Sequence, residues 1–97
     1  MAKPEVTGLI LTLNGAKHLD ACLASLDFCD QILVVDSGST YATRDIAAAR
    51  KARVLVNPWP GPKKQFEFAF AHITTPWVVY LDQDEILSDE LRASVIQ

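Results

Sequence analysis

The sequence is poor in cysteine, in long apolar runs and in positive charge. Cys22 and Cys29 form no C-x-x-C pair and have no histidine near them in sequence, so we expect buried free thiols in a reducing cytosol. No apolar run approaches the roughly 20 residues that span a bilayer. A net charge of −3 gives no support for a general nucleic-acid-binding surface.

What remains is the composition of a small globular protein. The 97 residues are 49% hydrophobic, enough for one compact domain with a substantial core. The first five residues lack the apolar core of a signal peptide. We therefore expect a cytoplasmic location, and peripheral attachment to the inner face of a membrane stays open.

Apolar, β-prone segments alternate with helical patterns along the chain. The expected strands are Val6–Leu13, Gln31–Val35, Arg53–Val56 and Trp77–Leu81, and the expected helices are Ala16–Leu26, a segment capped by Thr43 and running to about Lys51, one after the irregular stretch 59–62, and one capped by Ser88. The aromatic residues Phe66, Phe68 and Phe70 also fit a strand, but a parallel sheet needs a crossover there. This alternation predicts an α/β fold with a doubly wound, mainly parallel, Rossmann-like sheet.

Polar residues gather where the predicted strands end. Thr12 and Asn14 end the first strand, Asp36 ends the second, and Asp82 and Asp84 end the fourth. In an open parallel sheet, ligands bind outside the carboxyl ends of the strands. These residues are therefore expected to line one crevice.

Each of these residues also has a structural interpretation. Asp36 can bond its own Ser-Gly-Ser-Thr turn, and Asn14 can cap the following helix. The run from Asp82 to Glu85 can be only an acidic turn. Carboxylates are, however, the hard oxygen ligands that suit Mg²⁺ or Mn²⁺. A bare acidic turn would not explain the coincidence with Asp36 and Asn14, so we favour a metal and ribose site.

The sequence resembles the family 2 glycosyltransferases, which have the GT-A fold. The matching stretches are L-T-L-N at 11–14, C-L-A-S-L at 22–26, V-V-D-S-G-S-T at 34–40, W-P-G at 59–61 with Gln65, and W-V-V-Y-L-D-Q-D-E-I-L-S at 77–88. The most similar members are bacterial lipopolysaccharide-core and cell-surface polysaccharide enzymes with L-D-A-D-E, where this chain has Gln83.

The resemblance implies a nucleotide-sugar site. Members of the family transfer a sugar from a nucleotide-sugar donor to an acceptor hydroxyl, usually with inversion. By this resemblance Thr12 and Asn14 line the base pocket, Asp36 accepts a hydrogen bond from the base, Asp82 contacts the ribose, and Asp84 of the D-x-D motif binds the divalent cation, Mg²⁺ or Mn²⁺. The donor is expected to be a UDP-sugar, and the acceptor a glycan or a lipid-linked glycan of polysaccharide biosynthesis.

The sequence also departs from the family pattern. Tyr41 replaces an aspartate, and Phe66 and Glu67 replace a basic residue and an asparagine. The family's general base lies in a C-terminal half, so we assign no catalytic residue. We expect residues 1–97 to be one nucleotide-sugar-binding domain of a truncated glycosyltransferase, inactive alone and self-associating through an exposed sheet edge. The alternative is a non-catalytic, magnesium-binding α/β module resembling receiver domains.

Overall fold

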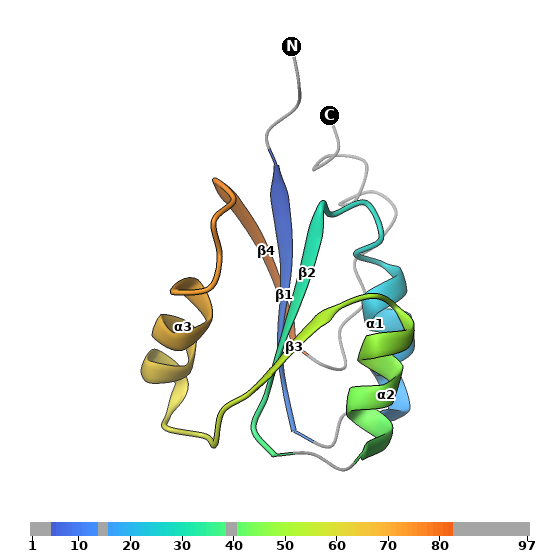
Figure 1. Ribbon diagram of the computed structural model, residues 1–97, viewed down its shortest axis with the longest axis horizontal. Helices are drawn as coiled ribbons and strands as arrows, with labels where there is room; N and C mark the ends of the chain where they lie inside the picture. The colour runs from blue at the N-terminus through green and yellow to red at the C-terminus, as the bar shows by residue number, and fades with distance from the viewer. Residues whose placement is uncertain (1–4, 14–15, 39–40, 83–97) are drawn as a thin grey trace.

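The computed structural model describes residues 5–13, 16–38 and 41–82 (Figure 1). Strands and helices alternate along this part of the chain, as the sequence predicts. The elements are β1 (Val6–Thr12), α1 (Ala16–Ala24), β2 (Gln31–Asp36), α2 (Tyr41–Ala49), β3 (Arg53–Val56), α3 (Pro62–Phe70) and β4 (Trp77–Asp82).

The four described strands form one parallel sheet in the order β3-β2-β1-β4. Helices α1 and α2 cover one face of the sheet, and α3 covers the other (Figure 1). The predicted doubly wound α/β fold is therefore confirmed. No described helix is long and apolar enough to cross a membrane.

The core is split between the two faces because neighbouring strand residues point to opposite sides. On the α1 and α2 side, Ile10 and Val34 pack with Leu19 and Leu23 of α1. On the α3 side, Leu9 of β1 packs with two apolar residues of β2 and with Ala69 of α3. A strand buried on both faces has no polar alternation, which explains the continuous apolar runs in the sequence.

Two predicted helix starts are wrong. Helix α2 begins at Tyr41, so Thr43 lies inside the first turn, where it is buried and cannot act as the N-cap. Helix α3 begins at Pro62, which we expected to be irregular. Proline is tolerated there because the first-turn N–H groups have no helical partner, and Gly61 enters the helix with a φ of 104°. The predicted cap Ser88 lies outside the described residues.

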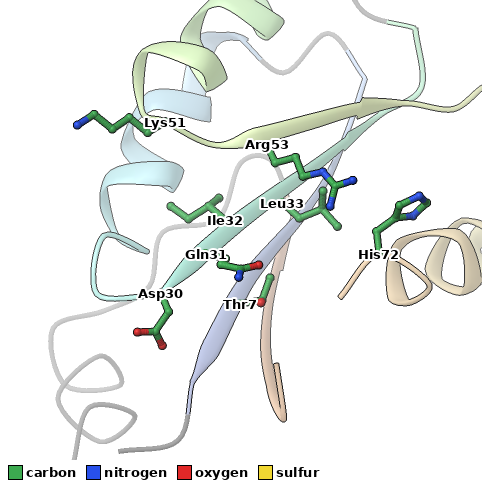
Figure 2. A pocket seen from close by; sticks show the side chains of 8 residues that line it. All are labelled: Thr7, Asp30, Gln31, Ile32, Leu33, Lys51, Arg53 and His72. Carbon is green, nitrogen blue, oxygen red and sulfur yellow. The ribbon is translucent and has the colours of Figure 1, made fainter. Parts of the chain in front are cut away.

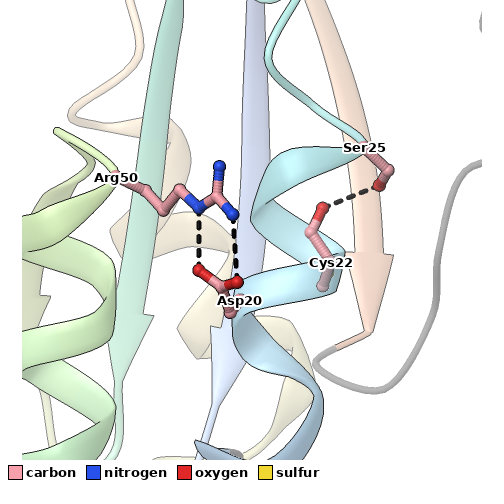
Figure 3. A network of polar contacts seen from close by, with 4 residues as sticks. All are labelled: Asp20, Cys22, Ser25 and Arg50. Carbon is pink, nitrogen blue, oxygen red and sulfur yellow. Dashed lines mark hydrogen bonds and ion pairs between the residues drawn. The ribbon is translucent and has the colours of Figure 1, made fainter.

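The connector after α1 packs closely on the middle of β1. Helix α1 ends at Ala24, and the Ser25 hydroxyl donates a 2.7 Å hydrogen bond back to the Cys22 carbonyl (Figure 3). A Cβ on Gly8 would lie 3.0 Å from Leu26 Cδ1 and 3.3 Å from Cys29 Sγ. The connector therefore leaves little room at this position, and any side chain there would have to displace Leu26 and Cys29 slightly. Cys22 and Cys29 form no disulfide, and the expected burial is complete for Cys22 but only partial for Cys29.

We predict that Gly8→Val lowers the free energy of unfolding by about 1–3 kcal/mol, the usual cost of overpacking a core. The branched side chain would have to displace Leu26 and Cys29. Gly8→Ala should cost less, because its single added carbon meets the end of a flexible leucine side chain. Urea unfolding of the three proteins checks this order, and a valine variant as stable as wild type would contradict it.

A surface ion pair joins α1 to the end of α2. Arg50 Nε lies 2.7 Å from Asp20 Oδ1, and Nη2 lies 2.9 Å from Oδ2 (Figure 3). The hydrogen bonds from Arg50 lower the pKa of Asp20 below its ordinary value, and the same bonds raise the pKa of Arg50. The side chain of Asp20 is 62% exposed and that of Arg50 is 41% exposed, so solvent screens the pair and its contribution to stability is small.

The stabilisation from this pair should depend on pH. Because the folded pKa of Asp20 is lowered, its contribution is complete above the unfolded value of about 4 and is lost as pH falls through the folded pKa. Urea unfolding should therefore show wild type slightly more stable than Asp20→Asn near pH 7, with the gap closing as the pH falls through the lowered folded pKa of Asp20. A gap that does not change with pH would contradict the prediction.

Candidate functional site

The structure places Thr12 and Asp36 side by side at the carboxyl edge of the sheet. They are partners in the parallel register of β1 and β2, and both are buried. Just beyond them, the Ser37 N–H donates a 3.0 Å hydrogen bond to the Thr12 carbonyl. The predicted convergence of these two strand ends is therefore present.

The end of β3 lies on the other side of Asp36. Val56 pairs with Asp36, and the N–H of Asn57 donates a 2.8 Å hydrogen bond to the Asp36 carbonyl. The loop that leads from β3 to α3 is thereby attached next to Asp36. This loop contains the exposed Trp59 and the glycine that precedes α3.

A glutamine in α3 completes this edge. The Gln65 side chain is fully buried, and its Oε1 accepts a 2.7 Å hydrogen bond from Asn57 Nδ2. Its Nε2 donates to the Asn57 carbonyl at 3.0 Å and to Ser37 Oγ at 3.4 Å. Sequence reasoning did not select Gln65 as a site residue. The available signals were its place in the family-matching stretch with W-P-G and its four-residue spacing from Ala69, which is buried on the same helix face.

The structure describes the acidic stretch only as far as Asp82. Asp82 is the last residue of β4 and pairs with Leu11 of β1, one residue before Thr12. Its backbone therefore reaches the same edge, while its side chain is outside the description, as are Asn14 and Asp84. Among the described residues, no three histidine, cysteine or acidic side chains are close enough to hold a metal ion.

A cavity of about 260 Å³ lies at the opposite, amino-terminal edge of the sheet. Its lining includes the strand-start residues Thr7, Gln31 and Arg53, together with Lys51 and His72 (Figure 2). Lys51 and His72 lie on opposite sides of the cavity (Figure 2). This cavity is separate from the edge where Thr12 and Asp36 meet, and its charged side chains do not converge on one point.

The chain matches the family model "Glycosyl transferase family 2" over residues 9–97. It is 35% identical over 95 residues to the lipopolysaccharide core biosynthesis glycosyltransferase LpsC of Rhizobium meliloti (strain 1021), covering 93% of this chain and 35% of that protein. An uncharacterized glycosyltransferase of Rickettsia bellii (strain RML369-C) is also 35% identical, covering 94% of this chain and 31% of its own length.

The fold is similar to that of glucosyl-3-phosphoglycerate synthase from Mycobacterium tuberculosis. The crystal structure of that enzyme with UDP matches with a TM-score of 0.74 and 26% identity, covering 86% of this chain and 35% of that chain. Its structure with Mn²⁺, UDP and glucosyl-3-phosphoglycerate matches with a TM-score of 0.71 and 25% identity, covering 82% and 33%.

The chain thus spans about a third of the length of the curated relatives it matches. The family model nevertheless covers most of this chain, including all seven described elements except the start of β1. The same stretch contains Asp36, Gln65 and the end of β4, the residues that build the carboxyl edge. By both sequence and fold, this chain belongs to glycosyl transferase family 2.

Proposed function

We propose that residues 1–97 form the nucleotide-sugar-binding part of an inverting glycosyltransferase. The donor is a UDP-sugar, and the acceptor is a lipopolysaccharide or another glycan. The observation that carries this proposal is the in-register pairing of Thr12 with Asp36 at the carboxyl edge. A protein with a similar fold, glucosyl-3-phosphoglycerate synthase from Mycobacterium tuberculosis, has been solved with UDP, and the relative LpsC is a lipopolysaccharide core glycosyltransferase.

In the proposed site, different residues at this edge contact different parts of the nucleotide. Thr12 and Asn14 line the base pocket, and Asp36 accepts a hydrogen bond from the base. Asp36 suits this role because its main chain is held on both sides, by Ser37 bonding to Thr12 and by Asn57 bonding to Asp36. Asp82 follows on the neighbouring strand, where it would contact the ribose.

The acidic stretch fits a divalent cation. Strand β4 brings Asp82 to the carboxyl edge, and Asp84 follows two residues later. Carboxylate oxygens are ligands that Mg²⁺ and Mn²⁺ prefer. A cation held by Asp84 would neutralise the negative charge that develops on a leaving diphosphate. The similar mycobacterial enzyme has been solved with UDP and either Mn²⁺ or Mg²⁺.

The receiver-like alternative loses its support once the family is known. A receiver domain needs acidic residues directly after the first strand, and this chain has Leu13 and Asn14 there. The family match spans the same strand end. We assign no general base, because the family resemblance implies that this residue lies in a C-terminal half.

Calorimetric titration of UDP into the chain, with and without Mn²⁺, tests the donor site. We expect binding that requires the metal and that weakens by about tenfold or more in Asp84→Ala and in Asp36→Asn, a loss of about 1.4 kcal/mol per factor of ten. Asp45→Asn is the matched control, because Asp45 is an exposed carboxylate on α2. If a folded wild type does not bind UDP, GDP or ADP with metal present, the donor-site proposal is wrong.

We also propose that the chain self-associates through β4. This strand is at one end of the described sheet order, so one side of its backbone has no described strand to pair with. Trp77, Val78 and Tyr80 are exposed on it, and Phe66 of α3 extends the patch by an edge-on contact with Tyr80, with ring centroids 4.9 Å apart. The β4 edge of a second copy offers a complementary row of hydrogen-bonding groups.

Sedimentation velocity over a concentration series tests this association. We expect the mean sedimentation coefficient to rise with concentration for wild type. Val78→Lys should reduce the rise, because it puts a charge on the edge strand. Trp59→Ser is the control, since Trp59 is also an exposed large apolar residue, at 55%, but lies in the loop before α3. A wild type that stays monomeric at every concentration would rule out the proposed contact.

A further inference from the structure

We propose that Gln65 is a positioning residue of the donor site. Its hydrogen bonds hold Ser37, which follows Asp36 in sequence, and Asn57, which follows the neighbouring strand. In this way it sets the affinity for the nucleotide without contacting it. This inference rests on the proposed function for its effect on binding. Its structural part, the placement of Ser37 and Asn57, can be measured without a ligand.

The hydrogen-bonding groups of the Gln65 amide are already engaged inside the protein. Oε1 accepts from Asn57 Nδ2, and Nε2 makes two donor contacts, to the Asn57 carbonyl and to Ser37 Oγ. An amide nitrogen has two hydrogens, so both donors have an acceptor. The side chain is also fully buried. Gln65 therefore has no donor left for a ligand and can act on one only through its neighbours.

These hydrogen bonds join three elements at one place. Asn57 follows β3, Ser37 follows β2, and Gln65 belongs to α3. Asn57 in turn donates its N–H to the Asp36 carbonyl, and Ser37 donates its N–H to the Thr12 carbonyl. The series of bonds runs from α3 across the ends of β3, β2 and β1. Asp36 lies in the middle of it, and its main-chain carbonyl accepts the Asn57 N–H directly. In this proposal Gln65 therefore fixes the backbone that carries the Asp36 carboxylate.

The chemistry of the site explains why a glutamine is present. The position must both donate and accept, because Asn57 presents an N–H group and a carbonyl to it. A glutamate would keep the acceptor but lose both donors, and its charge would be buried. An apolar side chain would remove these hydrogen bonds from Asn57 and Ser37, which are both partly buried, and that loss is unfavourable. Helix docking alone needs none of this, since Ala69 and Phe66 already pack α3 against the sheet.

The experiment compares Gln65→Met with a matched control at the other end of the sheet. Methionine keeps the length of the side chain and removes the amide. The control is Thr7→Val, because Thr7 is also buried and its hydroxyl shares a 2.7 Å hydrogen bond with Thr75, near the amino end of β1. A milder variant, Asn57→Ala, removes one bond of the network and serves if Gln65→Met does not fold.

Two quantities are measured for each protein: the dissociation constant for UDP with Mn²⁺, and the hydrogen-exchange rates of the Ser37 and Asn57 amides relative to Leu9 in the sheet interior. We expect Gln65→Met to weaken UDP binding by about tenfold and to speed exchange selectively at Ser37 and Asn57. Asn57→Ala should weaken UDP binding by a smaller factor. Thr7→Val should lower the unfolding midpoint but leave UDP affinity and these two amides unchanged.

The outcomes separate this inference from the proposed function. If wild type binds UDP and Gln65→Met binds it within about twofold of wild type, Gln65 does not position the site. Faster exchange spread evenly over the sheet would also overturn the inference, because it would show only a loss of stability. If wild type does not bind UDP, the proposed function fails, and exchange at Ser37 and Asn57 alone decides whether Gln65 positions them.

Discussion

The parallel pairing of β1 with β2 is the constraint on which the rest of the structure depends. It runs in register from Thr7 with Gln31 to Thr12 with Asp36, so the two strands end together. Both strands are interior in the described sheet, with β3 and β4 on their outer sides. Burial on both faces excludes water from this pairing and strengthens its hydrogen bonds. The polar residues at its carboxyl end are therefore attached to a stable part of the molecule.

The two faces of the sheet contribute differently to the structure. Helices α1 and α2 bury most of the large side chains, so that face supplies much of the hydrophobic stabilisation. In helix α3 the fully buried side chains are Ala69 and the polar Gln65, while Phe66 and Phe68 pack against the sheet partly exposed. The helix also orients the ends of β3 and β2, because it connects them through hydrogen bonds. A directional hydrogen bond can fix the positions of neighbouring groups more accurately than apolar packing does.

Sequence patterns were sufficient for the fold and for the meeting of the ends of β1 and β2 at one edge of the sheet. Apolar runs such as that of β1 have few alternatives to a buried strand, and the polar residue that ends each run marks the carboxyl edge. Gln65 belongs to a stretch that matches the family, but the sequence gives it no role. It follows Lys63 and Lys64, and the apolar pattern does not predict that its polar side chain is buried. Its burial depends on where α3 docks, which is set by contacts distant in sequence.

The helix starts show a second limit of the sequence. Thr43 has the side chain of an N-cap, but the helix begins earlier, and the packing of Thr43 against the fold outweighs that local preference. Gly8 is the opposite case, because no local pattern requires glycine inside an apolar strand. Only the close passage of the α1 connector explains it, through the contacts that a Cβ would make with Leu26 and Cys29.

The strand order has a consequence for how a site at this edge can change. Thr12 and Asp36 end interior strands, whereas Asp82 ends a strand at the margin of the described sheet. A substitution near Asp36 disturbs neighbours on both sides, but one near Asp82 has a described strand on one side only. In the proposed site, base recognition is therefore the conservative element and the acidic stretch the adaptable one. Divergence in cation preference would require fewer compensating substitutions than divergence in the nucleotide.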